Sequence, residues 1–261
     1  MERYTLITGA SKGIGYELAK LFAKDHHNLI LVARSKDLLL NIKKEFEQKY
    51  NIKVIVIDVD LTKENVASDI YNKTKELNFE VEHLINNAGF GDYGFFLETS
   101  LEKNRNMIQH NITTLSELCY YYMKDMKEKG YGKVLNVASI ASFIPGPLMA
   151  TYYATKAYVL SFTEALSREF KNTGVKALTL CPGTTKTNFF DVASANESNL
   201  LKNMKPATPE KVALYGYKRF LKNKDNSKYG FKNRMLIFLV RLVPRKLVRN
   251  IAYKIQSKRK G

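Results

Sequence analysis

Residues 4–15 read Tyr-Thr-Leu-Ile-Thr-Gly-Ala-Ser-Lys-Gly-Ile-Gly, and this stretch decides the fold. A β-branched apolar run ends at Thr8, glycines follow at positions 9, 13 and 15, and a helical pattern begins behind them. Such a turn brings backbone N–H groups and a helix N-terminus against a pyrophosphate, whose charge the helix dipole favours. Glycine-rich turns also simply close loops, so the turn alone leaves nucleotide binding open.

Short β-branched runs alternate with longer helical patterns along the chain, which is typical of repeated βαβ units and a parallel sheet. The runs predict strands at 4–8, 28–33, 53–57, 83–86, 133–138 and 176–181. Three- and four-residue apolar spacing predicts helices at 13–24, 37–50, 63–77, 101–129, 151–172 and 209–221. We therefore expect an α/β fold, a Rossmann-like doubly wound parallel sheet of about six or seven strands with helices on both faces.

Composition is consistent with one such domain. The chain has 261 residues, 45% of them hydrophobic, which is enough to fold without disulfides or metals. The two cysteines, Cys119 and Cys181, are expected to be buried free thiols, which favours a reducing compartment. The N-terminal residues lack a secretory signal, and the apolar run Met235–Val243 is too short to cross a bilayer. We expect a cytoplasmic protein without a transmembrane span.

The residue after the second predicted strand indicates the cofactor. Enzymes that select NAD commonly place an acidic residue there to accept the ribose 2′-hydroxyl, whereas this chain has Arg34. Together with Lys12 in the turn, this guanidinium suits the 2′-phosphate of NADP(H), which arginine binds by paired hydrogen bonds. The alternative is that Arg34 and Lys12 are ordinary solvated surface charges.

Four residues are the candidate catalytic set: Asn111, Ser139, Tyr152 and Lys156. Tyr152 and Lys156 are four apart in a helical pattern, so they share a face, and the ammonium is expected to lower the phenol pKa. Ser139 directly follows a strand, where its hydroxyl can polarise a carbonyl oxygen, and Asn111 sits in the long central helix. Each alone is readily explained as helix surface, solvated charge, loop cap or packing amide; their joint occurrence is not.

These residues, in this order, resemble the short-chain dehydrogenase/reductase family over roughly Glu2 to Leu221. Thr8–Gly15 resembles its cofactor turn, residues 86–89 (Asn-Asn-Ala-Gly) its motif after the fourth strand, and Tyr152-x-x-x-Lys156 its catalytic pair. The resemblance implies NADP(H) contacts from Gly9, Ser11, Lys12, Gly13, Ile14, Gly15, Arg34, Asp60, Leu61, Asn87, Ala88, Gly89, Tyr152, Lys156, Pro182, Gly183, Thr185 and Thr187.

The same resemblance implies roles for the catalytic set. Tyr152 exchanges the proton, Lys156 also binds the nicotinamide ribose, Ser139 orients the substrate oxygen, and Asn111 holds a water of the proton relay. Asp60 contacts the adenine, with Asp58 as a competitor for that role. The resemblance also implies a homodimer or homotetramer. The chain is thus interpreted as an NADP(H)-dependent oxidoreductase that moves a hydride between the nicotinamide and a carbonyl or secondary alcohol, with reduction the favoured direction.

These motifs do not specify the substrate. It depends on residues 188–209, rich in Asn, Ala and Ser, and on neighbours that suggest an apolar pocket: Phe90, Phe95, Phe143, Tyr153 and Phe189. The segment from Gly230 to Arg245 resembles a subset of the family, similar to 3-oxoacyl and ketone reductases, that acts on lipid-like or bulky ketones. We expect a small apolar carbonyl compound.

The C-terminal stretch differs from the rest of the chain. The net charge is +17, and ten Lys or Arg residues but no acidic residue lie between Lys232 and Gly261. We divide the chain into a catalytic domain, 1–230, and a basic amphipathic extension, 231–261. The extension can lie on an anionic membrane, or pack on the domain or on a partner subunit. The alternative function is a membrane-recruited nucleotide-binding protein with a structural or regulatory role; nucleic acid is not an expected partner because no stacking platform accompanies the charge.

Overall fold

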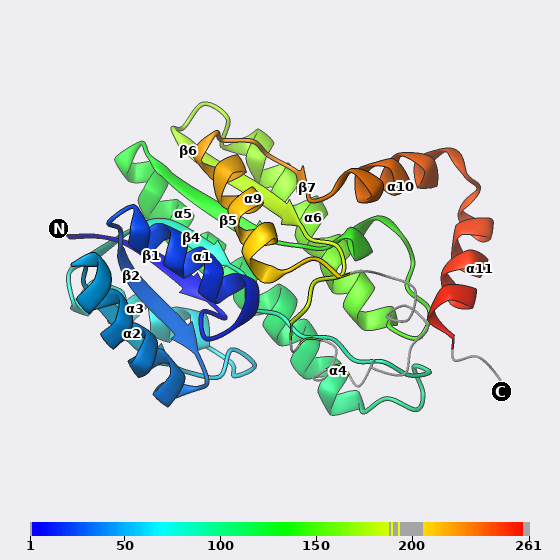
Figure 1. Ribbon diagram of the computed structural model, residues 1–261, viewed down its shortest axis with the longest axis horizontal. Coiled ribbons are helices and arrows are strands. Elements are labelled where there is room, and N and C mark those ends of the chain that lie inside the picture. Colours follow the sequence, from blue (N-terminus) through cyan, green and yellow to red (C-terminus); the bar gives the residue numbers. More distant parts are fainter. Residues whose placement is uncertain (1, 188, 190–192, 194–205, 258–261) are drawn as a thin grey trace.

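A seven-stranded parallel sheet forms the centre of the computed structural model, which describes residues 2–187, 189, 193 and 206–257 (Figure 1). The strand order is β3-β2-β1-β4-β5-β6-β7, so the chain reverses its direction of travel across the sheet between β1 and β4. The strands are β1 (Glu2–Thr8), β2 (Asn28–Ala33), β3 (Val54–Asp58), β4 (Phe79–Asn86), β5 (Gly132–Val137), β6 (Val175–Cys181) and β7 (Ser227–Lys228). This confirms the expected doubly wound sheet.

Helices cover both faces of the sheet because successive strand residues point to opposite sides. In β1, for example, Leu6 packs into the core beneath one helical layer and Ile7 into the core beneath the other. One layer contains α3 (Val66–Glu76), α5 (Leu115–Lys129) and α6 (Ala150–Glu169). The other contains α1 (Gly13–Lys24), α2 (Lys36–Tyr50) and α9 (Pro209–Leu221).

The helix expected over residues 101–129 is interrupted. It is divided into α4 (Leu101–Ile108), a π-helical turn η1 (Gln109–Thr114) and α5. Apolar periodicity continues through the interruption, so the sequence pattern did not reveal it. Single π-helical turns inside longer helices frequently occur at functional sites, and Asn111 lies within this one.

Polar side chains join the core elements beneath the site. Asn86 donates to Asn136 (2.9 Å) and Asn136 donates to Thr163 (2.9 Å), which links β4, β5 and α6. The thiol of Cys119 lies against both amides. Cys119 and Cys181 are buried and free, as expected. A buried polar group without a hydrogen bond destabilises the fold, so this network favours a single register between β4 and β5.

The chain ends in two helices, α10 (Phe231–Leu242) and α11 (Arg245–Gln256), here called the C-terminal arm. They extend beyond the carboxyl edge of the sheet (Figure 1). Of the alternatives for residues 231–261, the arm packs on its own domain through four buried side chains: Ile237, Val248, Ala252 and Gln256. No helix among the described residues is long and apolar enough to cross a membrane.

Candidate active site

A cavity of about 530 Å³ lies at the carboxyl ends of the strands, where ligands of open α/β sheets bind. The loops that follow β1 to β6 all contribute to its wall, which is why residues far apart in sequence meet there. Eighteen of the sequence-predicted site residues line it: Gly9, Ser11, Lys12, Gly13, Ile14, Arg34, Asp60, Leu61, Asn87, Ala88, Gly89, Ser139, Tyr152, Lys156, Pro182, Gly183, Thr185 and Thr187. Gly15 and Asn111 lie behind the wall.

The glycine turn forms one end of the cavity. Gly9 has a φ of +66°, and Gly15 lies so close to the Gly9 carbonyl that a Cβ on Gly15 would come within 2.2 Å of its oxygen. Asn87 ties the turn to β4, because its amide donates to the carbonyls of Thr8 (3.1 Å) and Gly9 (3.3 Å). No side chain caps the start of α1, whose first N–H groups therefore remain available for an anion.

The next part of the wall holds opposite charges. Arg34 is exposed at the rim and forms no ion pair with any residue that the structure describes. Asp60 accepts two hydrogen bonds from Thr62 (3.0 and 2.9 Å). Burial raises the Asp60 pKa, but these bonds and the nearby Arg34 outweigh burial and lower it overall. Its competitor Asp58 faces Lys36 instead (3.8 Å) and lies outside the cavity.

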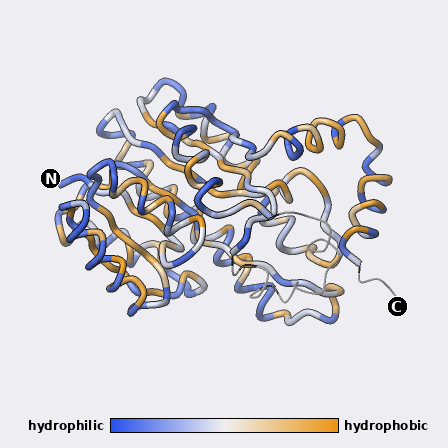
Figure 2. Tube along the Cα trace, in the orientation of Figure 1, coloured by the Kyte–Doolittle hydropathy of each residue, from blue (hydrophilic) through white to orange (hydrophobic). Residues whose placement is uncertain are grey.

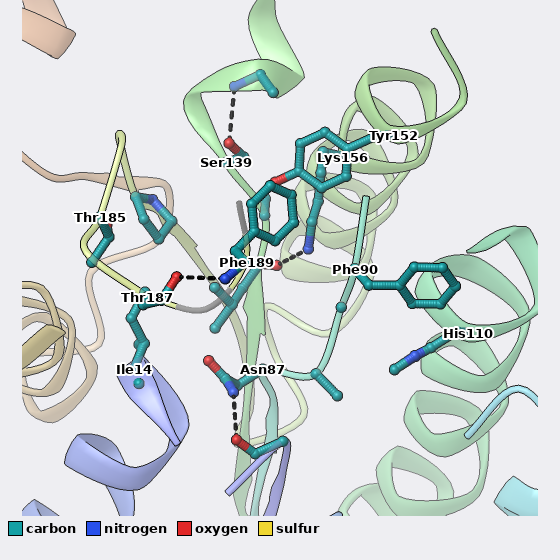
Figure 3. Close-up of a pocket in the computed structure, with 18 of the residues that line it drawn as sticks. Ile14, Asn87, Phe90, His110, Ser139, Tyr152, Lys156, Thr185, Thr187 and Phe189 are labelled. Atoms are coloured by element: carbon teal, nitrogen blue, oxygen red, sulfur yellow. Dashed lines mark hydrogen bonds between the residues drawn. The ribbon is translucent and has the colours of Figure 1, made fainter. Parts of the chain in front are cut away.

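Ser139, Tyr152 and Lys156 converge at the middle of the cavity (Figure 3). Ser139 follows β5 and caps a short helix, η2 (Ile140–Phe143), by accepting a hydrogen bond from the N–H of Ala141 (3.1 Å). Tyr152 and Lys156 lie one turn apart on α6, as predicted. The Lys156 ammonium donates to the carbonyl of Val137 (2.8 Å) and is thereby held beneath the tyrosine.

The pKa values of Tyr152 and Lys156 correct one of our expectations. Burial raises the pKa of Tyr152 to about 12, although the contact with the Ser139 hydroxyl lowers it slightly. Burial lowers the pKa of Lys156 to about 8. We expected Lys156 to lower the phenol pKa. That is wrong for this structure because the ammonium is directed at the Val137 carbonyl and both groups lose solvation.

Asn111 supports the wall from behind. Its amide donates to the carbonyl of Phe90 (2.9 Å) and to the hydroxyl of Thr155 (3.1 Å), and its oxygen accepts from the N–H of Phe90 (3.2 Å). The side chain thus fixes the loop after β4 against α6. A Cβ on Gly89 would come within 3.4 Å of the Asn111 oxygen and 3.1 Å of the Lys156 ammonium, so both groups lie against the same side of the glycine. The predicted role, holding a water, remains a prediction beside this observed positioning role.

The far end of the cavity is mostly apolar. Of the expected aromatic neighbours, Phe90, Tyr153 and Phe189 line it. Phe95 instead is 53% exposed, and Phe143 packs against the domain core, so neither lines the cavity. Residues 188, 190–192 and 194–205 of the predicted substrate loop lie outside the described residues. The C-terminal arm adds four lining residues that the sequence did not predict: Leu236, Ala252, Ile255 and Gln256.

His110 is a lining residue that the sequence interpretation missed. Neither ring nitrogen has a hydrogen-bond partner among the described residues, although both are shielded from solvent. The ring lies 5.4 Å from that of Phe90 and faces the cavity (Figure 3). Burial, aided by the positive charge of Lys156, lowers its pKa to about 4. The only signal for His110 in the sequence is that it directly precedes Asn111. The helical pattern does not show which residues of the helix face the cavity.

The fold and this cavity define an α/β protein of the dinucleotide-binding type, with a buried tyrosine and lysine in the cavity wall. The model of the short chain dehydrogenase family matches residues 3–198, so the chain belongs to this family. It is 36% identical to a very-long-chain 3-oxoacyl-CoA reductase of Vanderwaltozyma polyspora, over 66% of this chain and 52% of that protein. It is 34% identical to 17-beta-hydroxysteroid dehydrogenase type 3 of Mus musculus, over 72% and 61% respectively.

The alignments thus span about half to three fifths of these curated relatives. Among solved structures, a short-chain dehydrogenase from Sphingobium yanoikuyae in complex with NADPH superposes with a TM-score of 0.83 at 24% identity, covering 100% of both chains. That similarity extends over the C-terminal arm and supports the fold alone.

Proposed function

We propose that this protein is an NADP(H)-dependent oxidoreductase that interconverts an apolar carbonyl compound and its secondary alcohol. The observation that carries the proposal is one continuous cavity. It joins the glycine turn and Arg34 at one end to Ser139, Tyr152 and Lys156 in the middle, and it ends in an apolar wall. A dinucleotide and a small ketone together require this sequence of phosphate site, acid–base site and apolar pocket.

The residues present fit a bound NADP(H). The uncapped start of α1 suits the pyrophosphate, Arg34 and Lys12 suit a 2′-phosphate, and the unpartnered ring of His110 offers a hydrogen bond within the same wall. The cofactor supplies hydride chemistry when bound. The side chains of this protein bind, orient and exchange protons around it.

Tyr152 is the proton donor in the proposed reaction. With a pKa raised to about 12, its phenol is neutral at physiological pH and can donate to an oxygen that gains negative charge. Ser139, in contact with the same phenol, orients that oxygen. The Lys156 ammonium, held by the Val137 carbonyl, is placed to bind the ribose of the cofactor. Donation from a neutral phenol favours reduction of the carbonyl as the working direction.

The substrate class follows from the apolar wall and from relatives whose names specify 3-oxoacyl-CoA and hydroxysteroid reactions. Phe90, Tyr153 and Phe189 border the space next to Tyr152, and the ring of Phe189 lies 4.9 Å from that of Tyr152. We therefore propose a ketone or 3-oxoacyl-type compound with an apolar body. Cytoplasmic residence and a homodimer or homotetramer remain part of the proposal, to be measured by cell fractionation and sedimentation.

Fluorescence titration with NADPH and NADH tests the cofactor assignment. The native protein is expected to prefer NADPH by at least about tenfold, equivalent to about 1.4 kcal/mol. Arg34→Asp should abolish that preference, whereas Arg105→Asp, an equal charge change at an exposed α4 residue outside the cavity, should leave it intact. Failure of the native protein to bind either nucleotide would refute the enzyme assignment.

A membrane-recruited nucleotide-binding protein without turnover is the second candidate. Tyr152→Phe distinguishes the two, because it removes only the proton donor. For an enzyme, kcat should fall by about 10²–10⁴-fold while the NADPH Kd stays within about twofold. The second candidate predicts no turnover in the native protein and no effect of Tyr152→Phe on any cellular function.

A further inference from the structure

The C-terminal arm presents an apolar surface outward. In α10, Ile237 faces the domain and is 4% exposed. The opposite side carries Phe231, Met235, Phe238 and Leu242, which are 67%, 49%, 62% and 68% exposed. Their spacing of four, three and four residues places them on one stripe of the helix. An ordinary surface helix has polar residues there, so α10 has an apolar face that nothing in the described chain covers. Figure 2 shows the hydrophobic residues of the arm in orange.

The charge around this stripe is of one sign. The described part of the arm carries seven basic residues and no acidic one, and none of the seven forms an ion pair with another described residue: Lys232, Arg234, Arg241, Arg245, Lys246, Arg249 and Lys254. A second copy of the arm meeting the first would bring like charges together. An anionic bilayer instead attracts the basic rim and takes up the apolar stripe.

The exposed surface is continuous with the cavity. In α11, Leu247, Ile251 and Ile255 are each about half exposed and four residues apart, which makes a second apolar stripe. Its last member, Ile255, lines the cavity, as do Leu236 and Gln256. Gln256 donates a hydrogen bond to Tyr153, beside the acid–base tyrosine. An apolar path therefore leads from the outer surface of the arm to the site.

We propose that the C-terminal arm docks on the surface of an anionic lipid bilayer, with the outward stripe of α10 inserted among the acyl chains. The arm forms a wall of the cavity, so docking places the cavity mouth next to the lipid. The substrate is then an amphiphilic carbonyl compound that enters from the bilayer; this second statement depends on the proposed reductase function.

Vesicle flotation of the purified full chain tests docking without nucleotide or turnover. Vesicles of phosphatidylcholine with about one third phosphatidylglycerol should bind the protein at least about tenfold more strongly than phosphatidylcholine alone, and salt should weaken binding. The arm variant Arg241→Glu/Leu242→Glu should lose at least about tenfold in affinity. The control Lys44→Glu/Leu40→Glu, at exposed α2 residues with the same change of charge, should not.

Two outcomes overturn docking: equal losses in the arm variant and the control, or no binding of the native chain to anionic vesicles. In the second case, sedimentation without lipid identifies the other occupant. If the arm variant turns an oligomer into a monomer there, the stripe is a subunit interface.

The entry of substrate has its own test. Turnover of a vesicle-borne long-chain ketone should fall at least about tenfold in the arm variant, whereas a short soluble ketone should react as in the native protein. Native turnover of the soluble ketone without any turnover of the vesicle-borne one refutes entry from lipid. Turnover of neither ketone refutes the reductase function and leaves docking to be decided by flotation.

Discussion

The side-chain amide of Gln256, in the last helix, donates a 3.1 Å hydrogen bond to the phenol oxygen of Tyr153, the neighbour of Tyr152. Both side chains are buried. The backbone carbonyl of Gln256 also accepts a hydrogen bond from Tyr93 (2.6 Å). These two bonds attach the end of the arm to the apolar end of the cavity, so the stability of the arm depends on them.

Gln256→Leu should loosen the arm. The substitution leaves the Tyr153 hydroxyl buried without a partner, at a cost of about 1–3 kcal/mol. Trypsin should then cleave the arm after Lys246 or Arg249 at least about fivefold faster than in the native protein, since local opening exposes these bonds. Adding Tyr153→Phe to the variant removes the unpaired hydroxyl and should slow cleavage again. An unchanged rate in Gln256→Leu would mean that the bond does not hold the arm.

Gly146 should tolerate no side chain. A Cβ there would come within 2.1 Å of the Tyr153 ring, and the ring is held by Gln256. Gly146→Ala should lower the free energy of unfolding by about 1–3 kcal/mol, measured by urea denaturation. Gly130→Ala is the comparison, because its Cβ would meet nothing within 4 Å and only its φ of +77° is costly, about 1 kcal/mol. If both variants lose the same stability, the close approach at Gly146 carries no cost.

Binding of NADPH should depend on pH through Lys156. Burial lowers the pKa of this lysine to about 8, so its ammonium is lost as pH rises through that value. The affinity for NADPH should fall by up to about tenfold between pH 7 and pH 9. Lys156→Met has no charge to lose; it should bind more weakly at pH 7 and show no such transition. A transition that persists in Lys156→Met would assign it to another group.

The sequence predicted the site best for residues whose positions follow directly from the sheet topology or from helical spacing. Loops that follow parallel strands meet at one edge of the sheet, so Gly9, Arg34 and Ser139 could be assigned to a common site from strand positions, whereas Asn87 was implied only by the family resemblance. Tyr152 and Lys156 needed only helical spacing. Asp60 lines the cavity, whereas its competitor Asp58 lies outside it and faces Lys36.

What the sequence could not show depends on packing. Periodicity identified the apolar residues of the arm but not what they face, so the contribution of Ile255 and Gln256 to the cavity was missed. Periodicity also continues across the π-helical turn at Asn111, because only the hydrogen-bond pattern changes there. The pKa of Tyr152 is raised because the phenol is buried, and residue spacing in the sequence does not reveal burial.

His110 should make the fold sensitive to mild acid. Burial lowers its pKa to about 4, and burial likewise lowers that of His83, packed near Phe22 and Phe220, to about 4. Unfolded histidines bind protons below about pH 6.5, whereas these two in the folded state do not until about pH 4. The unfolded state therefore binds more protons in this window, and stability falls as pH decreases through it.

Urea denaturation without added nucleotide measures the effect between pH 6.5 and pH 5, above the range in which most carboxylates titrate. Each histidine should contribute a loss of about 1.5 kcal/mol in the free energy of unfolding over that interval. His110→Leu should remove one contribution and His83→Leu the other. The double variant should keep only the dependence due to His27, whose pKa burial also lowers. If the slope of His110→Leu matches that of the native protein, the imidazole is not kept neutral by burial, and the cavity wall around it is solvated.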